Sequence, residues 1–140
     1  MWLQKEIIPK PRNKGFYLIT DEILSSIHEI ETIKIGLVSL LLKHTSASLT
    51  LNENADPDVR TDMKKYFDKI VPENKNNYEH TSEGADDMPA HIKSSLLGNS
   101  ITIPISNGKL NLGTWQGIYL CEHRNYGGNR RLLITINGES

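Results

Sequence analysis

The stretch from Ile33 to Asn52 limits the fold of this chain more than any other segment. Its first part, IKIGLVSLLLKH, is almost continuously apolar, which is typical of a central strand of a sheet. Its second part, SASLTLNEN, alternates, with Ala47, Leu49 and Leu51 on one face and polar residues on the other. One strand of this length would greatly exceed the usual ~5–6 residues. The stretch therefore predicts two strands joined by a bend near KHTS.

Three helices are expected among the remaining segments. The clearest covers NADPDVRTDMKKYFDKIVP, where Asp56 suits the N-cap and Pro57 suits the first turn. Another follows the strand GFYLIT, and a third begins near Asp87 and ends before Gly98. Apolar residues at helical spacing predict the buried face of each helix. In chain order these faces are Ile23, Ile27 and Ile30; Val59, Met63, Phe67 and Ile70; and Ile92 and Leu96.

The remaining strands complete a single expected domain over residues 1–140. KEIIPK precedes GFYLIT, and SITIPIS, a short KLNLG, WQGIYLCEH and RRLLITING end the chain. The element order is ββα-ββ-αα-βββ. This order predicts an α+β fold with a mainly antiparallel β-sheet and helices packed on one side.

Composition excludes several classes of protein. Charged residues make up 24% and apolar residues 37% of the chain, which indicates a globular protein. The formal net charge of −1 offers no general field for nucleic acid or an anionic membrane. No apolar run is long enough to span a bilayer, and the first residues do not resemble a secretory signal. Cys121 is the only cysteine, so we expect a cytoplasmic protein without disulfides, and without nucleic acid or membrane partners.

The stretch YEHTSEGADDMPAHIK holds the histidines His80 and His91, with acidic residues between them. Asp86 and Asp87 followed by a proline are also ordinary capping residues at a helix start, so a purely structural role stays open. His91 is expected near the positive end of the helix dipole, which disfavours the imidazolium form. A neutral imidazole is what a metal ligand or a general base requires.

A metal site in this region needs a third ligand from elsewhere in the sequence. The spacing of His80 and His91 matches no standard zinc signature, and H-E-x-x-H is absent. His44 is the best third candidate because it stands at the end of the predicted central strand, and Glu53 and Glu122 are further candidates. Such a site would suit a divalent metal, zinc or magnesium, with an open coordination position.

Two further polar stretches have both a structural and a functional interpretation. The face Ser46, Ser48, Thr50 and Asn52 suits either the wet side of a sheet or a binding surface. In LGTWQGIYLCEHR, Glu122 suits a base, a ligand or a salt bridge to Arg124, and Trp115 suits a stacking platform or a buried anchor. The cluster of Arg124, Arg130 and Arg131 fits an exposed hairpin turn or a phosphate site.

Together, HTSASLTLNEN, EGADDMPAHIK and LGTWQGIYLCEHR resemble the YjbQ family, which also carries the name secondary thiamine-phosphate synthase. The resemblance covers nearly the whole chain. It implies an α+β antiparallel fold, a homotrimer with pockets near the subunit contacts, and a polar pocket that contains histidines. Carried over by motif, the pocket comprises His44, Ser46, Asn52, Glu53, His80, Asp87, His91, Trp115, Gln116 and Glu122.

The family name implies an enzyme that joins a pyrimidine methyl pyrophosphate to a thiazole phosphate and releases pyrophosphate. Such chemistry needs charge stabilisation on the leaving group, normally by a divalent metal together with Arg or Lys. We expect Asp86, Asp87 or Glu83 to hold Mg²⁺ and Lys93 or Arg130 to meet phosphate. We expect His44, His80, His91 and Glu122 to act as bases or ligands. The alternative is a protein that binds a metal or a small phosphorylated metabolite with little turnover.

Overall fold

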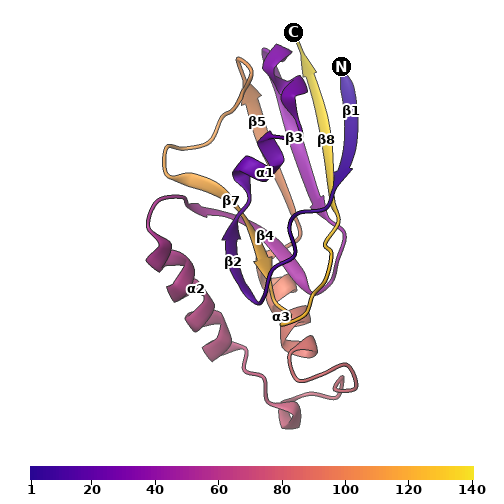
Figure 1. The fold of residues 1–140 in the computed structure, drawn as a ribbon, viewed down its shortest axis with the longest axis vertical. Coiled ribbons are helices and arrows are strands. Elements are labelled where there is room, and N and C mark those ends of the chain that lie inside the picture. Colours follow the sequence, from indigo (N-terminus) through magenta and orange to yellow (C-terminus); the bar gives the residue numbers. More distant parts are fainter.

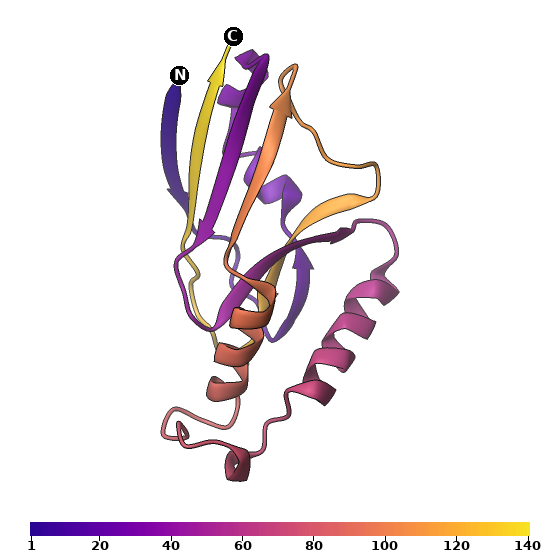
Figure 2. The same ribbon diagram turned by 180° about the vertical axis from the view of Figure 1, so that it is seen from behind.

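The strands are divided between two antiparallel sheets in the computed structural model, which describes residues 1–140 (Figures 1 and 2). The larger sheet has the strand order β1-β8-β3-β5-β6 and the smaller sheet has the order β2-β7-β4. The larger sheet comprises β1 (Trp2–Ile7), β8 (Leu132–Glu139), β3 (Ile35–Leu42), β5 (Ser100–Ser106) and β6 (Lys109–Leu110). The smaller sheet comprises β2 (Gly15–Leu18), β7 (Gln116–Glu122) and β4 (Ala47–Glu53).

The helical segments are α1 (Thr20–Leu24), α2 (Pro57–Ile70), α3 (Asp87–Leu97) and the short 3-10 turns η1 (His28–Thr32) and η2 (Lys75–Asn77). The start of α2 is capped as predicted, because Asp56 Oδ1 accepts a hydrogen bond from the Asp58 backbone N–H at 2.9 Å. None of the helices has the length and apolar content needed to cross a bilayer.

The predicted bend between two strands is confirmed. β3 ends at Leu42 and β4 begins at Ala47, so the intervening residues carry the chain from the larger sheet to the smaller one. Backbone N–H groups of Leu42 and Leu49 donate to the carbonyl oxygens of Asn99 and Gly98, at 2.8 and 3.0 Å. The turn is therefore fastened to the end of α3, which brings the KHTS segment next to that helix.

The main core lies between the two sheets. Val38 and Leu40 of β3 pack in one cluster with Leu49 of β4, Ile118 of β7 and Ile23 of α1. The opposite face of the smaller sheet carries a second cluster of Phe16, Tyr119 and Cys121, against which Met63 and Phe67 of α2 pack. The smaller sheet is thus a middle layer, with the larger sheet on one side and α2 and α3 on the other. The α+β class and the antiparallel pairing are confirmed, and the predicted single sheet is two.

The two earlier helices differ in detail from the prediction. Ile23, Ile27 and Ile30 are buried as expected, but they lie on α1, a connecting segment and η1 rather than on one continuous helix. On α2 no residue is fully buried, and Ile70 is 47% exposed.

The predicted buried face of α3 is wrong. Leu96 is 60% exposed, whereas Lys93 and Ser94 are buried. Lys93 Nζ bonds Asp68 Oδ1 of α2 at 2.7 Å, and Ser94 Oγ donates to the Ala47 carbonyl oxygen at 2.8 Å. Polar partners on α2 and β4 therefore decide which face of α3 turns inward.

Candidate functional site

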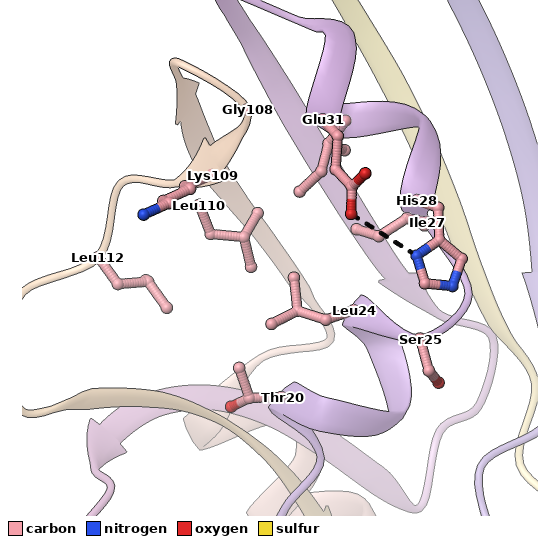
Figure 3. A pocket seen from close by; sticks show the side chains of 11 residues that line it. Thr20, Leu24, Ser25, Ile27, His28, Glu31, Gly108, Lys109, Leu110 and Leu112 are labelled. Carbon is pink, nitrogen blue, oxygen red and sulfur yellow. Dashed lines mark ion pairs between the residues drawn. The ribbon is translucent and has the colours of Figure 1, made fainter.

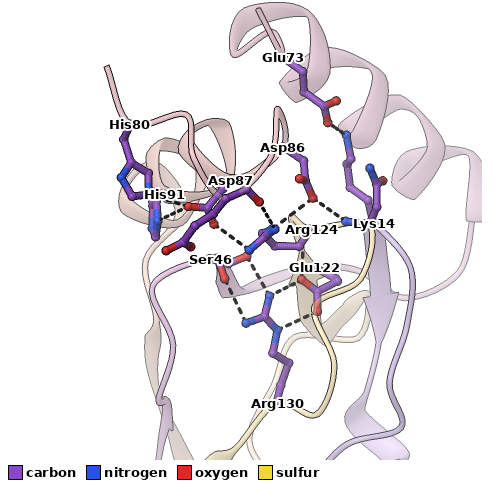
Figure 4. A network of polar contacts seen from close by, with 12 residues as sticks. Lys14, Ser46, Glu73, His80, Asp86, Asp87, His91, Glu122, Arg124 and Arg130 are labelled. Carbon is purple, nitrogen blue, oxygen red and sulfur yellow. Dashed lines mark hydrogen bonds and ion pairs between the residues drawn. The ribbon is translucent and has the colours of Figure 1, made fainter. Parts of the chain in front are cut away.

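Two histidines converge on one carboxylate oxygen at the start of α3 (Figure 4). His80 lies in the loop before the helix, and its Nε2 is 2.7 Å from Asp87 Oδ2. His91 lies one turn after Asp87, and its Nε2 is 3.1 Å from the same oxygen. Asp87 is only 2% exposed, while both imidazoles reach solvent. The i, i+4 spacing on a helix places Asp87 and His91 on one face, as this contact requires.

The hydrogen bonds of His91 fix its proton on one nitrogen. Its Nδ1 lies 2.9 Å from the carbonyl oxygen of Thr45. Because a carbonyl only accepts, Nδ1 carries a proton, and the neutral imidazole then has a lone pair on Nε2. That lone pair faces the Asp87 carboxylate, which is also an acceptor. The contact is favourable only with a proton on Nε2 or with a cation between the two groups.

The donor set fits a divalent transition metal. One ligand atom from each of His80, Asp87 and His91 lies within 4.8 Å of the others. Zinc bonds to nitrogen and oxygen are about 2.0–2.1 Å long, so neighbouring ligands in a tetrahedral site are about 3.3 Å apart. The contacts of 2.7 and 3.1 Å to Asp87 are close to that spacing. A bond from the second ring nitrogen to a backbone carbonyl, as in His91, is also the usual support of a metal-bound imidazole.

Arg124 holds the other oxygen of Asp87. Its Nη1 donates to Asp87 Oδ1 at 2.8 Å, and its Nε donates to Asp86 Oδ2 at 3.2 Å. Asp86 Oδ2 also accepts the backbone N–H of Asn125 at 2.9 Å. Burial alone would raise the pKa of Asp87, but the bond from His80 and the charges of His91 and Arg124 outweigh it and lower that pKa. Asp87 is therefore ionised and presents only Oδ2 to the histidines.

A second buried ion pair continues this network. Arg130 Nε and Nη2 donate to the two oxygens of Glu122, at 2.7 and 2.6 Å. Arg130 also donates to Ser46 Oγ at 3.1 Å, and Ser46 follows the residue whose carbonyl accepts from His91. Glu122 Oε2 in turn accepts the backbone N–H of Arg124 at 3.1 Å. The contacts run from the histidines through both arginines and back to the KHTS segment.

His44 lies in the same region but outside the group of three donors. It lines a polar cleft of about 340 Å³ together with His91, Thr45, Ser95 and Asn99. Its Nε2 accepts the backbone N–H of Arg131 at 2.7 Å, so the neutral ring carries its proton on Nδ1. Burial, and next the charge of Arg130, lower the pKa of His44. The structure thus offers a neutral imidazole in the cleft beside His91.

Lys93 and Arg130, the residues expected to meet phosphate, are both buried in ion pairs. Lys93 bonds Asp68 between α3 and α2, and Arg130 bonds Glu122. Beneath α3, His123 Nε2 and Ser48 Oγ are 2.8 Å apart. Burial, with the charges of Lys93 and Arg130, lowers the pKa of His123 to about 3. Burial also raises the pKa of the Cys121 thiol to about 12, as the sequence prediction of an inert thiol requires.

The remaining predicted site residues lie at the opposite end of the smaller sheet. Asn52 and Glu53 end β4, and Gln116 begins β7 directly opposite Glu53. Trp115 precedes it and is 65% exposed. The length of β4 puts them roughly 20 Å from Ser46, at about 3.3 Å per residue. The structure therefore does not bring them to the histidines.

A larger and more apolar cavity lies elsewhere, between α1, η1 and β6 (Figure 3). Its volume is about 470 Å³, and Leu24, Leu110 and Leu112 form much of its wall. Its only close pair of titratable side chains is His28 and Glu31. Both are exposed, and His28 Nδ1 lies 3.8 Å from Glu31 Oε1. No predicted site residue lines it, so the His80, Asp87 and His91 group remains the candidate site.

Sequence reasoning offered Arg124 for a hairpin turn, a phosphate site or a pair with Glu122, but not as a partner of Asp87. It placed Asp87 with substrate or Mg²⁺ rather than with the histidines, and the structure pairs Glu122 with Arg130. The available signal was an arginine directly after a strand, followed by the glycines of NYGGN. Gly127 needs its small size, because a Cβ there would lie 2.2 Å from Glu122 Oε1.

Comparison with known proteins agrees with the resemblance of the three motifs. The family model described as "UPF0047 protein YjbQ-like" matches residues 5–139. The UPF0047 protein YjbQ of Escherichia coli O157:H7 is 55% identical over 139 residues, which cover 99% of this chain and 100% of that protein. The UPF0047 protein YugU of Bacillus subtilis is 43% identical over 110 residues, 73% of this chain and 80% of that protein.

Solved structures show the same fold. An uncharacterised YjbQ/UPF0047 family protein from Clostridium acetobutylicum is 34% identical with a TM-score of 0.78, covering 96% of this chain and 99% of that one. A YbjQ-like protein of unknown function from Sulfolobus solfataricus has a TM-score of 0.84 at 23% identity, covering 99% of both chains. The chain belongs to the YjbQ-like UPF0047 family.

Proposed function

We propose that this protein is a divalent-metal-assisted enzyme that acts on a small phosphorylated molecule at the His80, Asp87 and His91 site. One observation carries the proposal: Nε2 of His80 and Nε2 of His91 both approach one oxygen of the buried Asp87, while a backbone carbonyl holds His91 Nδ1. Two imidazoles and one carboxylate favour zinc over magnesium. Three protein ligands leave a position for water or substrate, as catalytic sites require.

The metal, when bound, would polarise a phosphoryl oxygen and stabilise negative charge on it. The protein's own residues position the substrate beside it. His44 lines the adjacent cleft with a free Nδ1–H, and can donate a hydrogen bond or a proton to a bound oxygen. Ser95 and Asn99 offer further neutral donors and acceptors in that cleft.

The specific reaction that we propose to test is the formation of thiamine phosphate, following the resemblance of the three motifs. Arg124, Arg130 and Lys93 each pair with a carboxylate, so none of these three cations is free to face a diphosphate. Stabilisation of the leaving pyrophosphate would then fall to the metal and to the exposed Lys43 and Arg131, which share the single carboxylate of Glu6. A low turnover rate for this reaction is the expected consequence.

We further propose a homotrimer in the cytoplasm. Ile35, Leu37 and Leu41 of β3 and Trp2 of β1 are exposed large apolar residues on the larger sheet. Adjacent exposed apolar residues of this kind are typical of a surface that another protein covers. A buried free thiol at Cys121 suits a reducing compartment.

The second candidate is a metal- or metabolite-binding protein with little turnover. The complete pairing of nearby cations favours it, because it leaves His44 as the only titratable side chain beside His91 in the polar cleft. His44→Gln separates the two candidates. An enzyme would keep its metal and lose activity, whereas a binding protein would show no activity to lose.

The first experiment is metal content per chain after reconstitution with zinc and, separately, with magnesium. We expect one zinc per chain in the parent protein, loss of it in His80→Ala and His91→Ala, and retention in the control His28→Ala, which changes an exposed histidine elsewhere. Production of thiamine phosphate and pyrophosphate from the two substrates, with and without chelator, then tests the reaction. Stoichiometric metal in both variants, or none in the parent, would refute the site.

A further inference from the structure

The outward face of α3 is an apolar stripe. Met88, Ile92 and Leu96 recur at four-residue spacing, and together with His91 and Ser95 they line a groove of about 300 Å³. The stripe spans roughly 12 Å at 1.5 Å per residue. That length matches one or two linked aromatic rings.

The outward face of α3 departs from the ordinary pattern of a surface helix. A surface helix normally buries its apolar stripe and exposes its polar face. This helix buries Pro89 and Ala90 as that pattern predicts, but it also buries Asp87, Lys93 and Ser94 and leaves Leu96 60% exposed. Local rules of this kind are broken mainly at functional sites, so the exposed stripe calls for an occupant.

The groove is continuous with the candidate metal site. His91 and Ser95 line both the apolar groove and the polar cleft that holds His44. His91 is also one of the three convergent donors. No lysine, arginine, aspartate or glutamate lines either surface. A ligand that extends from the metal site over these surfaces meets only neutral groups.

We propose that the groove of Met88, Ile92 and Leu96 binds the neutral aromatic body of the substrate, whose single phosphate head lies at the His80, Asp87 and His91 site. The placement of the head rests on the proposed function, and the placement of the body rests on the stripe. The substrate class is an aromatic phosphomonoester. The groove selects for it against small phosphates and against phosphates with a charged body, because charges on the body would lose water without gaining a partner.

The expected selectivity follows from the area that the body buries. Covering about 60 Å² of apolar surface at about 25 cal/mol per Å² changes affinity roughly tenfold. Removing the Leu96 side chain takes away the most exposed part of the stripe. Because that side chain contributes to no core cluster, Leu96→Ser is expected to fold normally.

Two probes with the same head test the proposal. The dissociation constants of phenylphosphonate and methylphosphonate are measured by calorimetry on zinc-loaded protein, for the parent, Leu96→Ser and the control Ile70→Ser. Ile70 is an exposed apolar residue at the end of α2, outside the site and outside the apolar surface of the larger sheet. We expect phenylphosphonate to bind about tenfold more tightly in the parent and in the control. In Leu96→Ser this ratio falls to about two or less, while the affinity for methylphosphonate is unchanged.

The other outcomes separate the two proposals. Equal binding of both probes to zinc-loaded parent overturns the aromatic groove and leaves the metal site intact. Failure of the parent to take up zinc, or of zinc-loaded parent to bind either probe, overturns the proposed function and the inference with it. Light scattering provides the last check. Leu96→Ser could show a lower molar mass than the parent with an unchanged ratio of the two dissociation constants. That result would assign the stripe to contact between copies of the chain and would overturn the proposal that the groove binds the aromatic body.

Discussion

The two ends of the smaller sheet carry similar polar residues, but these residues form different kinds of hydrogen bond. At one end, Ser46 and Glu122 bond to Arg130, which lies 84 residues from Ser46 in the sequence. At the other end, Asn52 Oδ1 accepts from the next backbone N–H, and Gln116 Oε1 accepts from Gly113, three residues earlier. The first end joins distant segments through bonds between side chains. At the second end, the bonds that link distant segments run from a side chain to a backbone carbonyl, as from Asn54 Nδ2 to Thr114 and from the Tyr119 hydroxyl to Glu53.

This difference shows which kind of polar contact indicates a site. Bonds from a side chain to the nearby backbone are ordinary turn and cap chemistry. Bonds among side chains from distant segments form only when several elements of the fold are correctly placed. They then fix the relative positions of those side chains, as a binding or catalytic site requires. By this criterion Asn52, Glu53 and Gln116 support local structure, and the candidate site lies at the Glu122 end.

Loss of the buried Glu122 charge gives the largest expected difference between the ends. Glu122→Gln leaves the buried charge of Arg130 without a counter-charge, and is expected to lower the free energy of unfolding by about 3–5 kcal/mol. Glu53→Gln, at the other end, is expected to cost about 1 kcal/mol or less, because Glu53 only accepts from Asp56 N–H at an exposed position. Guanidinium unfolding measures both. Equal losses in the free energy of unfolding for the two variants would contradict the distinction between the two ends of the smaller sheet.

Acid should destabilise the protein through His123, which follows Glu122. Its pKa is about 3 when folded, against an ordinary value of 6.5. Its contribution to stability is present above pH 6.5 and is lost as pH falls toward 3, because the unfolded chain binds the proton more readily. The expected loss is at most about 1.4 kcal/mol per pH unit. His123→Asn should flatten this dependence between pH 6 and 4, whereas the exposed His28→Asn should leave it unchanged. Parallel pH curves for parent and His123→Asn would contradict the assignment.

Arg124→Gln tests whether the network supports the proposed metal site. Freeing Asp87 Oδ1 from Arg124 loosens the carboxylate, and the expected loss of zinc affinity is about 10–100-fold. The matched variant Arg131→Gln removes an exposed arginine that pairs with Glu6, and should leave zinc affinity within about twofold. Competition with a chromogenic chelator measures both affinities. Equal affinities in the two variants would limit Arg124 to a structural role.

Gln116→Ala gives the smallest expected effect. It removes one exposed bond to Gly113 N–H, at a cost of about 0.5–1 kcal/mol in the free energy of unfolding. Zinc affinity should not change, because the residue lies at the far end of β7. A loss of zinc affinity comparable with that of Arg124→Gln would mean that the two ends act as one site.

Sequence reasoning predicted the fold better than it predicted the site. The switch from a continuous apolar run to alternation located the bend between β3 and β4, and the cap at Asp56 located the start of α2. Four-residue spacing showed that Ile92 and Leu96 share a face of α3, but spacing cannot say which face turns inward. That choice depends on Asp68 and Ala47, which bind Lys93 and Ser94 from other elements.

The histidines show the same limit. His80 and His91 were expected to meet, and the structure brings them together on Asp87. His44 was expected as the third donor, yet it lies in the neighbouring cleft with its Nε2 bonded to the Arg131 backbone. The position of Arg124 depends on the direction of the chain after the end of β7 at Glu122, and no local sequence motif predicts that direction. Long-range geometry, rather than residue type, was the missing information.

The spread of the network along the chain has a consequence for the order of folding. Thr45, His80, Asp87 and His91 are synthesised before Arg124, and Arg130 follows last. Contacts over 37 and 84 residues close slowly, because chain entropy opposes them until both sheets have paired. A nascent chain therefore has the convergent donors before it has the arginine that restrains them. The hydrogen bond that restrains Asp87 can therefore form only after the three donors have been synthesised.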